Sequence, residues 1–559
     1  MKDVIETAIA DALAELGLTE VDFVVEHPAE LAHGDYASNV ALVAAKQLGQ
    51  APSVVAEQLR AMLEGQIEYV DSITIAGPGF INFTLAREFL AAETARARTQ
   101  GWGEHDSEAG KRILVEYTDP NPFKEFHIGH LFTNAVGESI ARLFMFAGAD
   151  VKRVNYQGDV GLHVACALYG MHKLGLTTES EFTARDLGRA YATGATAYKE
   201  DEIAQTTIRN INKQVYERSD ELVNELYDKG RTVSLAYFED IYALLGTKFD
   251  EYFFESEAGP QGKELVLAHP NVFPESDGAR VFKGEEYGLH TRVFLNKEGL
   301  PTYEAKELAL AKLKEDRLGV YDHSVISTAR EISEYFKVLL SAMGQVYPEL
   351  AAKTEHIGHG MVRLKSGKMS SRTGDVIVAL DFIEEVAISV RTKMSETAGV
   401  DAIDSNLAND IAVGAIKYAT LKSSISQDSI FDAEQALSFE GDSGPYLMYT
   451  HARICSVLEK AAAVGVSPSA NAPATPYELE RILYRFPEVV EAALAERAPH
   501  KVGSFLIELA GTFNTFYANE KIADPADEYA PYKATLADAV RQTLHNGLYV
   551  LGIKAPTKM

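Results

Sequence analysis

One ten-residue segment concentrates side chains suited to binding phosphate. NPFKEFHIGH, residues 121–130, holds Lys124, His127, Gly129 and His130. An ammonium group and imidazole N–H groups donate hydrogen bonds to phosphate oxygens, and a glycine lets a nucleotide lie against the backbone. If the histidines begin a helix, its N-terminus also favours an anion. The segment therefore predicts a nucleotide phosphate site.

Two simpler interpretations of the histidine pair stay open. Histidines three residues apart can bind a metal ion, although no third ligand lies nearby in the sequence. They can also be incidental residues of a helix start. The letters HIGH recur at 356–359, so the string alone does not identify a site. Only the first copy follows a strand-like run and opens a long helical pattern, and we interpret the second copy as coincidental.

A second basic segment lies far along the chain. SGKMSSRTGD, residues 366–375, supplies Lys368 and Arg372 among small polar residues. Basic groups on such a loop can close over a triphosphate and stabilise charge on the leaving pyrophosphate. Alone, the segment is equally typical of a surface turn. Together with the histidine segment it forms a specific pair of signals.

The histidine segment needs a strand and a helix to position it. KRILVEY, residues 111–117, is a short apolar run typical of a strand, and VKRVNY, residues 151–156, is another. Between them, apolar residues recur at helical spacing from about Ile128 to Phe146. Such a βαβ unit implies a parallel sheet, and its ligands bind at the carboxyl ends of the strands.

The rest of the chain divides into further parts. Residues 1–65 indicate helices separated by a polar loop, and residues 72–85 indicate a strand pair. Residues 175–260 are mostly polar helices and read as an insertion. Residues 293–314 predict a hairpin and then a helix. From about Asp381 the pattern is almost wholly helical.

Composition excludes several classes of protein. The 559 residues exceed what one hydrophobic core supports, so we expect about three domains. No apolar run is long enough for a membrane span, and the acidic amphipathic start is unlike a signal peptide. The two cysteines form no CxxC pair, which argues against disulfides and a zinc site and favours a reducing, cytoplasmic location. The net charge of −28 argues against indiscriminate nucleic-acid binding but leaves room for one specific polyanion.

Six blocks of sequence carry a family resemblance over almost the whole length. They are VEYTDPNPFKEFHIGHLF, VNYQGDVGLHVACAL, KMSSR, SFEGDSGPYLMYTHARICSVL, FNTFYANEKI with LGIKAPTKM, and HGDYASNVALVAAKQL with GPGFINFTL. In their order along the chain they resemble the class I aminoacyl-tRNA synthetases, and among these the arginyl-tRNA synthetase family.

The resemblance implies an architecture of three domains. We expect a Rossmann-like α/β parallel-sheet catalytic domain, an N-terminal α+β domain and an all-α C-terminal domain that binds the anticodon. The expected boundaries are 1–108 for the N-terminal tRNA-binding domain, 109–380 for the catalytic domain with its insertion near 175–260, and 381–559 for the anticodon-binding domain.

The resemblance also implies a reaction. Arginine and ATP give arginyl-adenylate and pyrophosphate, and the arginyl group then passes to the 3′ end of tRNA(Arg). A substrate carboxylate is already ionised, so the protein must mainly position the reactants and stabilise negative charge. Mg²⁺ is expected with ATP, held mainly by its phosphates, and no structural metal is expected. We further expect a cytoplasmic monomer that binds no DNA and no membrane.

The resemblance assigns roles at the nucleotide. The catalytic groups would be His127, His130, Lys124, Lys368 and Arg372. The ATP contacts would be His127, Gly129, His130, Met361, Val362 and Lys368. The family's second signature usually has another lysine where this chain has Ser371. In relatives that lack it, a lysine just ahead of the histidines is thought to substitute, which makes Lys124 the candidate, although a solvated loop lysine is the simpler alternative.

Arginine selection requires carboxylates, because a guanidinium pairs with them through two parallel hydrogen bonds. The resemblance implies Glu116, Asn121, Tyr303 and Glu307 as arginine contacts. Relatives mostly carry Asp where this chain has Glu307, and a solvated helix glutamate is the alternative. One turn further on are Leu310 and Ala311, so no lysine pairs with Glu307 at that spacing. A family glutamine expected near 329–331 is absent.

Contacts with tRNA are implied at both ends of the chain. The anticodon would meet Tyr446, Tyr449, Arg453 and Tyr517, although any single tyrosine can equally belong to a core. The elbow of the tRNA would meet Phe80 and Asn82. In this family, adenylate formation usually needs bound tRNA, a form of induced fit.

Two rival functions remain at this stage. One is a class I synthetase for another amino acid, of which lysine fits the carboxylates best. The other is a non-catalytic RNA-binding paralogue, suggested only by Ser371 and Glu307. The presence of His127, His130 and Lys368 speaks against it.

Overall fold

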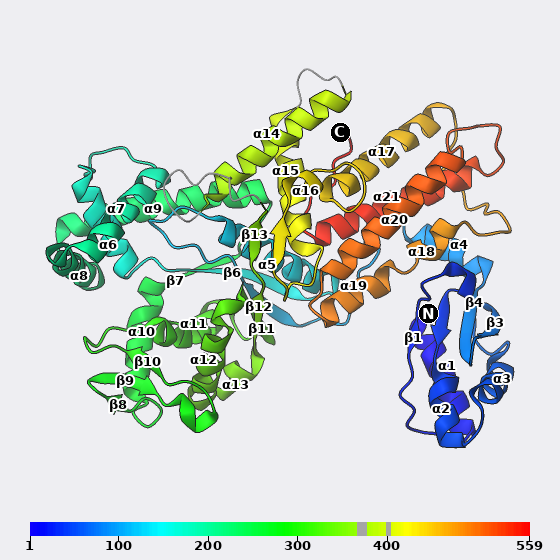
Figure 1. The fold of residues 1–559 in the computed structure, drawn as a ribbon, viewed down its shortest axis with the longest axis horizontal. Coiled ribbons are helices and arrows are strands. Elements are labelled where there is room, and N and C mark those ends of the chain that lie inside the picture. The colour runs from blue at the N-terminus through cyan, green and yellow to red at the C-terminus, as the bar shows by residue number, and fades with distance from the viewer. Residues whose placement is uncertain (366–376, 399–403) are drawn as a thin grey trace.

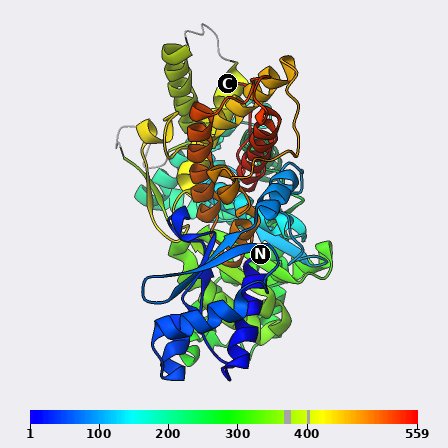
Figure 2. The same cartoon turned by 90° about the vertical axis from the view of Figure 1, so that its right-hand side faces the viewer.

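The computed structural model describes residues 1–365, 377–398 and 404–559, and Figure 1 shows three parts. The N-terminal part, in blue, lies below the C-terminal helices, and the central sheet with its helices makes up the rest. Figure 2, turned by 90°, again places the blue part below the orange and red helices. Within the described residues, no helix combines the length and hydrophobicity needed to cross a bilayer.

Five parallel strands form the central sheet, in the order β12–β11–β5–β6–β7. Their bounds are β5 Arg112–Glu116, β6 Asp150–Gln157, β7 Glu251–Phe254, β11 His323–Ala329 and β12 Thr354–His359. The first of them in sequence, β5, lies in the middle of the sheet. The strand order therefore reverses between β5 and β11. Ligands of open α/β sheets bind at such a switch point, beside the carboxyl ends of the strands.

The predicted βαβ unit is confirmed. Helix α5, Ile128–Phe146, joins β5 to β6 with the bounds expected from its apolar spacing. The helical insertion expected for 175–260 ends earlier than predicted, because Glu251–Phe254 is the edge strand of the central sheet. In this four-residue strand only Phe253 is buried, so its alternation is too short to stand out among polar helices.

Along the chain, mostly helices lie between β6 and the small sheet that precedes β11. They are α6 Leu162–Lys173, α7 Ala184–Glu200, α8 Glu202–Glu217, α9 Glu221–Leu245 and, after β7, α10 Glu255–Ala268. The three-stranded antiparallel sheet contains β8 Glu275–Ser276, β9 Ala279–Phe282 and β10 Arg292–Leu295. Helix α11, Tyr303–Leu318, then leads to β11, as the pattern in 293–314 predicts. The later elements are α12 Ser333–Val346, α13 Pro348–Lys353 and β13 Val362–Leu364.

Helices α6 and α7 cross at two glycines, and this contact makes a stability prediction. A Cβ at Gly194 would lie 1.9 Å from the carbonyl oxygen of Cys166, and one at Gly170 would lie 1.8 Å from that of Ala190. Gly194→Ala should therefore separate the helices and destabilise the protein by about 1–3 kcal/mol, the usual cost of overpacking. Thermal unfolding measures the effect.

Gly344→Ala is the matched control for this prediction. Gly344 is also helical, and a Cβ there meets no described atom within 4 Å. Because alanine is the better helix former, this variant should keep or slightly raise the melting temperature. Equal melting temperatures for Gly194→Ala and the wild type would contradict the close helix crossing.

The N-terminal part is an α+β unit, as predicted. Its antiparallel sheet has the order β1–β2–β4–β3. The elements are α1 Lys2–Glu15, β1 Val25–Glu26, β2 Tyr36–Ser38, α2 Val40–Leu48, α3 Pro52–Leu63, β3 Val70–Ala76, β4 Phe80–Leu85 and α4 Arg87–Arg96. The polar loop expected between its first helices contains β1 and β2. Tyr36 is fully buried and pairs with Phe83, a contact distant in sequence that the local pattern does not reveal.

The C-terminal part is almost wholly helical, as predicted. Its helices are α14 Ala379–Ala398, α15 Ser405–Leu421, α16 Ala433–Ala436, α17 Gly444–Ala463, α18 Glu478–Leu483, α19 Phe486–Ala495, α20 His500–Asn519 and α21 Ala530–Val550. One short strand, β14 Ser429–Phe431, is the exception and pairs in parallel with β13. The N-terminal part docks on this bundle through the ion pairs Arg87–Glu480 and Arg481–Asp35.

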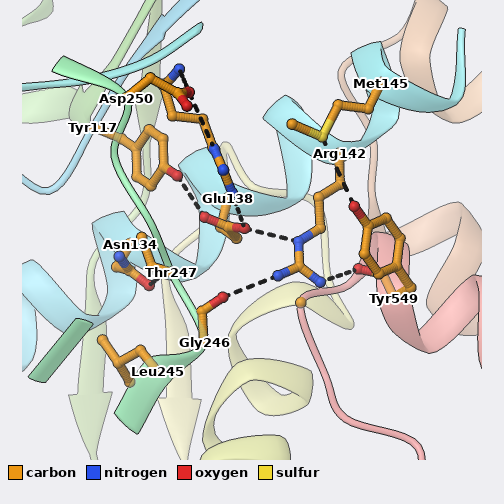
Figure 3. Close-up of polar contacts among 12 residues, drawn as sticks. Tyr117, Asn134, Glu138, Arg142, Met145, Leu245, Gly246, Thr247, Asp250 and Tyr549 are labelled. Atoms are coloured by element: carbon orange, nitrogen blue, oxygen red, sulfur yellow. Dashed lines mark hydrogen bonds and ion pairs between the residues drawn. The ribbon is translucent and has the colours of Figure 1, made fainter. Parts of the chain in front are cut away.

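A cluster of polar contacts around the buried Glu138 joins helix α5 to the C-terminal part (Figure 3). Glu138 accepts hydrogen bonds from Tyr117, from Arg142 at 2.8 Å and from Arg153 at 3.4 Å. Arg142 also donates to the carbonyl oxygens of Tyr549, at 2.8 Å, and Gly246, at 3.1 Å. Burial alone would raise the pKa of Glu138, but Arg142 and its neighbouring cations lower it overall. Helix α5 is thus held by both the insertion and the C-terminus.

Candidate active site

The loop that follows β5 is held in an unusual backbone conformation. Thr118, Asp119 and Phe123 have φ values of 81°, 45° and 68°, which non-glycine residues seldom adopt. Specific hydrogen bonds hold the loop: Asp119 accepts from the Tyr156 amide at 2.8 Å, and the Phe123 amide donates to Ser234 at 2.9 Å. Such conformations persist where the surroundings over-determine them, most often at functional sites.

The two predicted histidines lie side by side at the start of α5. Their rings stack with centroids 3.6 Å apart, and the His127 amide donates to Nδ1 of His130 at 3.3 Å. Burial, together with Lys124, lowers the pKa of His127, and burial lowers that of His130 well below its ordinary range. Both imidazoles are therefore neutral at pH 7. Because Nδ1 of His130 accepts a hydrogen bond, its Nε2–H remains available as a donor.

The chain that follows the second basic segment lies beside this helix start. Lys368 and Arg372 lie outside the described residues. Directly after that segment, the carbonyl oxygen of Ile377 accepts a hydrogen bond from the Ile128 amide at 3.1 Å, and His127 forms an antiparallel bridge with Val378. Residues 377 and 378 are thus attached beside the stacked histidines.

The two copies of HIGH occupy different structures, as their contexts predict. The first begins α5, whereas the second is the end of β12. His356 stacks on Phe336 with centroids 3.9 Å apart, and His359 bonds Thr133 of α5 at 2.9 Å. The predicted ATP contacts Met361 and Val362 follow β12, and Met361 is 40% exposed.

A cavity of about 530 Å³ opens beside the histidine loop, a volume suited to a small-molecule ligand. Lys124 lies in its wall, with Nζ 4.7 Å from the centre of the Tyr191 ring, and burial lowers the pKa of this lysine. Tyr303 also lines this cavity. The other lining residues include His163, Cys166, Tyr198, Tyr216, Glu255, Asn296 and Lys306.

Asn121 faces a carboxylate that sequence reasoning missed. A Cβ built on Gly158 would lie 2.3 Å from Oδ1 of Asn121 and 3.2 Å from Oε1 of Glu255, so both groups border the same glycine. Glu255 is 2% exposed and forms an ion pair with Lys306 at 2.5 Å. It opens α10 directly after β7. Its position directly after a strand could have indicated a site residue. The sequence analysis assigned 175–260 to a helical insertion and therefore did not recognise that strand.

The other predicted arginine contacts lie on β5 and α11. Glu116 does not offer both oxygens to a ligand, because its Oε2 lies 2.5 Å from Nζ of Lys314. Glu307 is half-buried, and desolvation followed by the nearby Glu116 raises its pKa well above the ordinary range. Lys314 lies two helical turns beyond Glu307, outside the one-turn spacing considered from the sequence.

The predicted anticodon contacts form one partly exposed cluster on α17 and α20. The Arg453 guanidinium lies 4.7 Å from the Tyr449 ring and 6.0 Å from the Tyr517 ring. Asn514 joins Arg453 to the hydroxyl of Tyr446. Tyr449 and Tyr517 are 36% and 38% exposed, which leaves ring surface for stacking.

The two predicted contacts in the N-terminal part differ in exposure. Phe80 is 39% exposed at the start of β4, whereas Asn82 is 4% exposed. Asn82 pairs with Ala37 and Thr74 of the neighbouring strands. An Asn82 side chain buried in the sheet has little surface for tRNA, so only Phe80 stays a direct candidate.

Three family models match the chain. They are described as tRNA synthetases class I (R), catalytic domain, over residues 95–433, DALR anticodon binding domain, over 447–559, and arginyl tRNA synthetase N terminal domain, over 3–85. Among curated proteins, the arginine–tRNA ligase of Clostridioides difficile is 29% identical over 575 residues, covering 100% of this chain and 99% of that protein. The corresponding ligase of Levilactobacillus brevis is 29% identical over 570 residues and is covered completely, as is this chain.

Solved structures agree with these matches. The arginyl-tRNA synthetase of Thermus thermophilus aligns with a TM-score of 0.81 at 28% identity, covering 100% of both chains. The arginyl-tRNA synthetase of Plasmodium falciparum, at 20% identity and a TM-score of 0.80, covers 100% of this chain and 98% of its own and shares the fold.

Proposed function

The chain belongs to the class I arginyl-tRNA synthetase family and is an arginine–tRNA ligase, and from this premise we propose how its residues divide the reaction. In the first step, the arginine carboxylate attacks the α-phosphorus of ATP and pyrophosphate leaves. In the second, a hydroxyl of the terminal ribose of tRNA(Arg) attacks the arginyl carbonyl and AMP leaves. Both steps need orientation and stabilisation of negative charge more than acid–base chemistry.

The main support for the proposed phosphate-binding residues is that several hydrogen-bond donors lie together at the switch point of the sheet. The neutral imidazoles of His127 and His130 offer N–H groups at the N-terminus of α5, where a helix favours phosphate. Lys124 adds an ammonium group from the wall of the adjoining cavity. Gly129 leaves the backbone open to the nucleotide, and Mg²⁺ would arrive bound to the ATP phosphates.

Pyrophosphate would be held by Lys368 and Arg372. The attachment of Ile377 beside Ile128 supports this role, because it anchors the neighbouring chain next to the histidines. Since Ser371 replaces the second lysine of the signature, Lys124 takes over its contact with phosphate.

We assign arginine binding to Asn121, Tyr303 and Glu307. Asn121 accepts from the substrate ammonium group, and Glu307 pairs with the guanidinium. Glu255 joins this set, because its carboxylate borders Gly158 together with Asn121. Glu116 ends β5 and forms an ion pair with Lys314.

The remaining proposals concern the whole molecule. Residues 1–108, 109–380 and 381–559 act as the tRNA-elbow, catalytic and anticodon domains. The cluster around Arg453 binds the anticodon, and Phe80 contacts the tRNA elbow. We also propose that the enzyme works in the cytoplasm as a monomer.

Amino-acid specificity is the direct test. The purified chain is incubated with ATP, an unmodified tRNA(Arg) transcript, and arginine, lysine or glutamine in turn, and charged tRNA is counted. Only arginine should be attached. Charging with lysine but not arginine would refute the arginine site, and no charging with several arginine tRNAs would favour a non-catalytic RNA-binding role.

A further inference from the structure

A buried lysine lies beside two of the predicted arginine contacts, Glu116 and Glu307, and none of the proposed steps uses it. Lys314 projects from α11, and its Nζ lies 2.5 Å from Oε2 of Glu116 at the end of β5. Both side chains are 2% exposed. A lone charge in such a place would be costly, whereas the pair compensates itself.

Lys314 and Glu307 border the same small internal space, together with Tyr321. The acidic groups that face this region come from several elements: Glu116 on β5, Asp119 in the following loop, Glu307 on α11 and Glu255 on α10. The hydroxyl groups of Tyr156 on β6, Tyr321 before β11 and Tyr335 on α12 are also buried here, and none has a hydrogen-bond partner among the described residues.

Charge balance explains why a lysine is needed. Neighbouring buried carboxylates repel one another, so they cannot all ionise at neutral pH. Burial and the adjacent Glu116 raise the pKa of Glu307, while Lys314 opposes the rise. Burial lowers the pKa of Lys314, but Glu116 and Glu307 outweigh it and raise the pKa overall, so the lysine stays cationic.

A substrate guanidinium brings one positive charge and needs one ionised partner. If Glu116 were unpaired, its charge would compete for the guanidinium and would also hold Glu307 in its protonated form. With Lys314 in place, Glu116 is neutralised by the protein itself.

We propose that Lys314 is a positioning residue of the arginine site, which occupies Glu116 and so reserves Glu307 as the ionised partner of the substrate guanidinium. The proposal rests on the function above and deepens it. In this view, arginine recognition depends on an ion pair within the protein, Lys314 with Glu116, that does not touch the reacting atoms.

The test is the pH dependence of the KM for arginine. In Lys314→Met, the carboxylates lose their counter-ion and bind protons more tightly. The KM for arginine should therefore rise about 10-fold at pH 7, since about 1.4 kcal/mol of binding is lost, and should return towards the wild-type value near pH 9. The KM for ATP should not change. Lys314→Arg, which keeps the cation, should preserve the wild-type profile.

Lys312→Met is the matched control on the same helix. Lys312 is 41% exposed and pairs with Glu315 and Asp316 at the surface, so its loss should leave the arginine KM unchanged at every pH. A purely structural role for Lys314 would lower kcat or the melting temperature without any pH-dependent change in the arginine KM, and that result would overturn the proposal.

A double variant covers the case in which Lys314→Met does not fold. Glu116→Gln/Lys314→Met buries no net charge, and replacing both partners of a buried pair is usually tolerated. Whatever the size of its arginine KM, the change of that KM with pH should follow the wild type, because the repulsion and the compensation disappear together. A profile shifted to higher pH would refute the proposed division of charge. If the wild type itself fails to charge arginine, the proposed function fails instead, before any variant is compared.

Discussion

Replacing Lys124 with alanine should slow arginyl-adenylate formation about 100-fold, the scale of losing one preorganised donor to a developing negative charge. Lys124 lies three residues before His127 and reaches the cavity wall, where burial lowers its pKa and partly strips its water. A partly desolvated ammonium group interacts more strongly with phosphate than a solvated one. The rate is measured by arginine-dependent exchange of pyrophosphate into ATP with tRNA present.

Lys173→Ala is the control for this substitution. Lys173 also lies over a tyrosine ring, with Nζ 5.2 Å from the centre of Tyr169, but at the end of α6 and away from the cavity lining. Its loss should leave the exchange rate unchanged. If Lys124→Ala exchanges pyrophosphate as fast as the wild type, Lys124 does not replace the lysine missing at Ser371.

Replacing Glu307 with glutamine should raise the KM for arginine about 100-fold and leave the KM for ATP nearly unchanged. Loss of one partner from a buried charge pair costs roughly 2–5 kcal/mol, and a 100-fold change corresponds to about 2.7 kcal/mol. Because burial and Glu116 raise the pKa of Glu307, the wild-type carboxylate ionises more fully as pH rises. The difference between wild type and variant should therefore grow from pH 7 to pH 9.

Glu307→Asp separates charge from reach. It keeps the carboxylate and shortens the side chain by one methylene, which gives the aspartate expected at this position from the family resemblance. Its arginine KM should lie much closer to that of the wild type than to that of Glu307→Gln. Equal arginine affinity in all three proteins would place the guanidinium elsewhere in the cavity.

Much of the architecture follows from local sequence. The strand at 111–117, the helix from Ile128 to Phe146 and the strand at 151–156 are confirmed, because alternation and helical spacing report directly which faces are buried. The same applies to the phosphate site. His127 and His130 are three positions apart at one helix start, and this spacing places their rings side by side.

Contacts between distant segments needed the tertiary structure. Glu255 reaches Asn121 only because β7 joins the edge of the central sheet, and Lys314 reaches Glu116 only because α11 packs beneath β5. Strand pairing also buries Asn82, which the sequence leaves indistinguishable from an exposed residue. The periodicity of a segment indicates which of its faces is buried, but not which other segment packs against that face.

The chemistry of the nucleotide end can thus be derived from the amino-acid sequence, because neighbouring residues act together there. The charge balance of the amino-acid end depends on the three-dimensional arrangement, because cations and burial contributed by other elements determine the state of each carboxylate. Electrostatic energies in an interior depend on distances of a few ångströms between such groups, and chain order alone does not specify those distances.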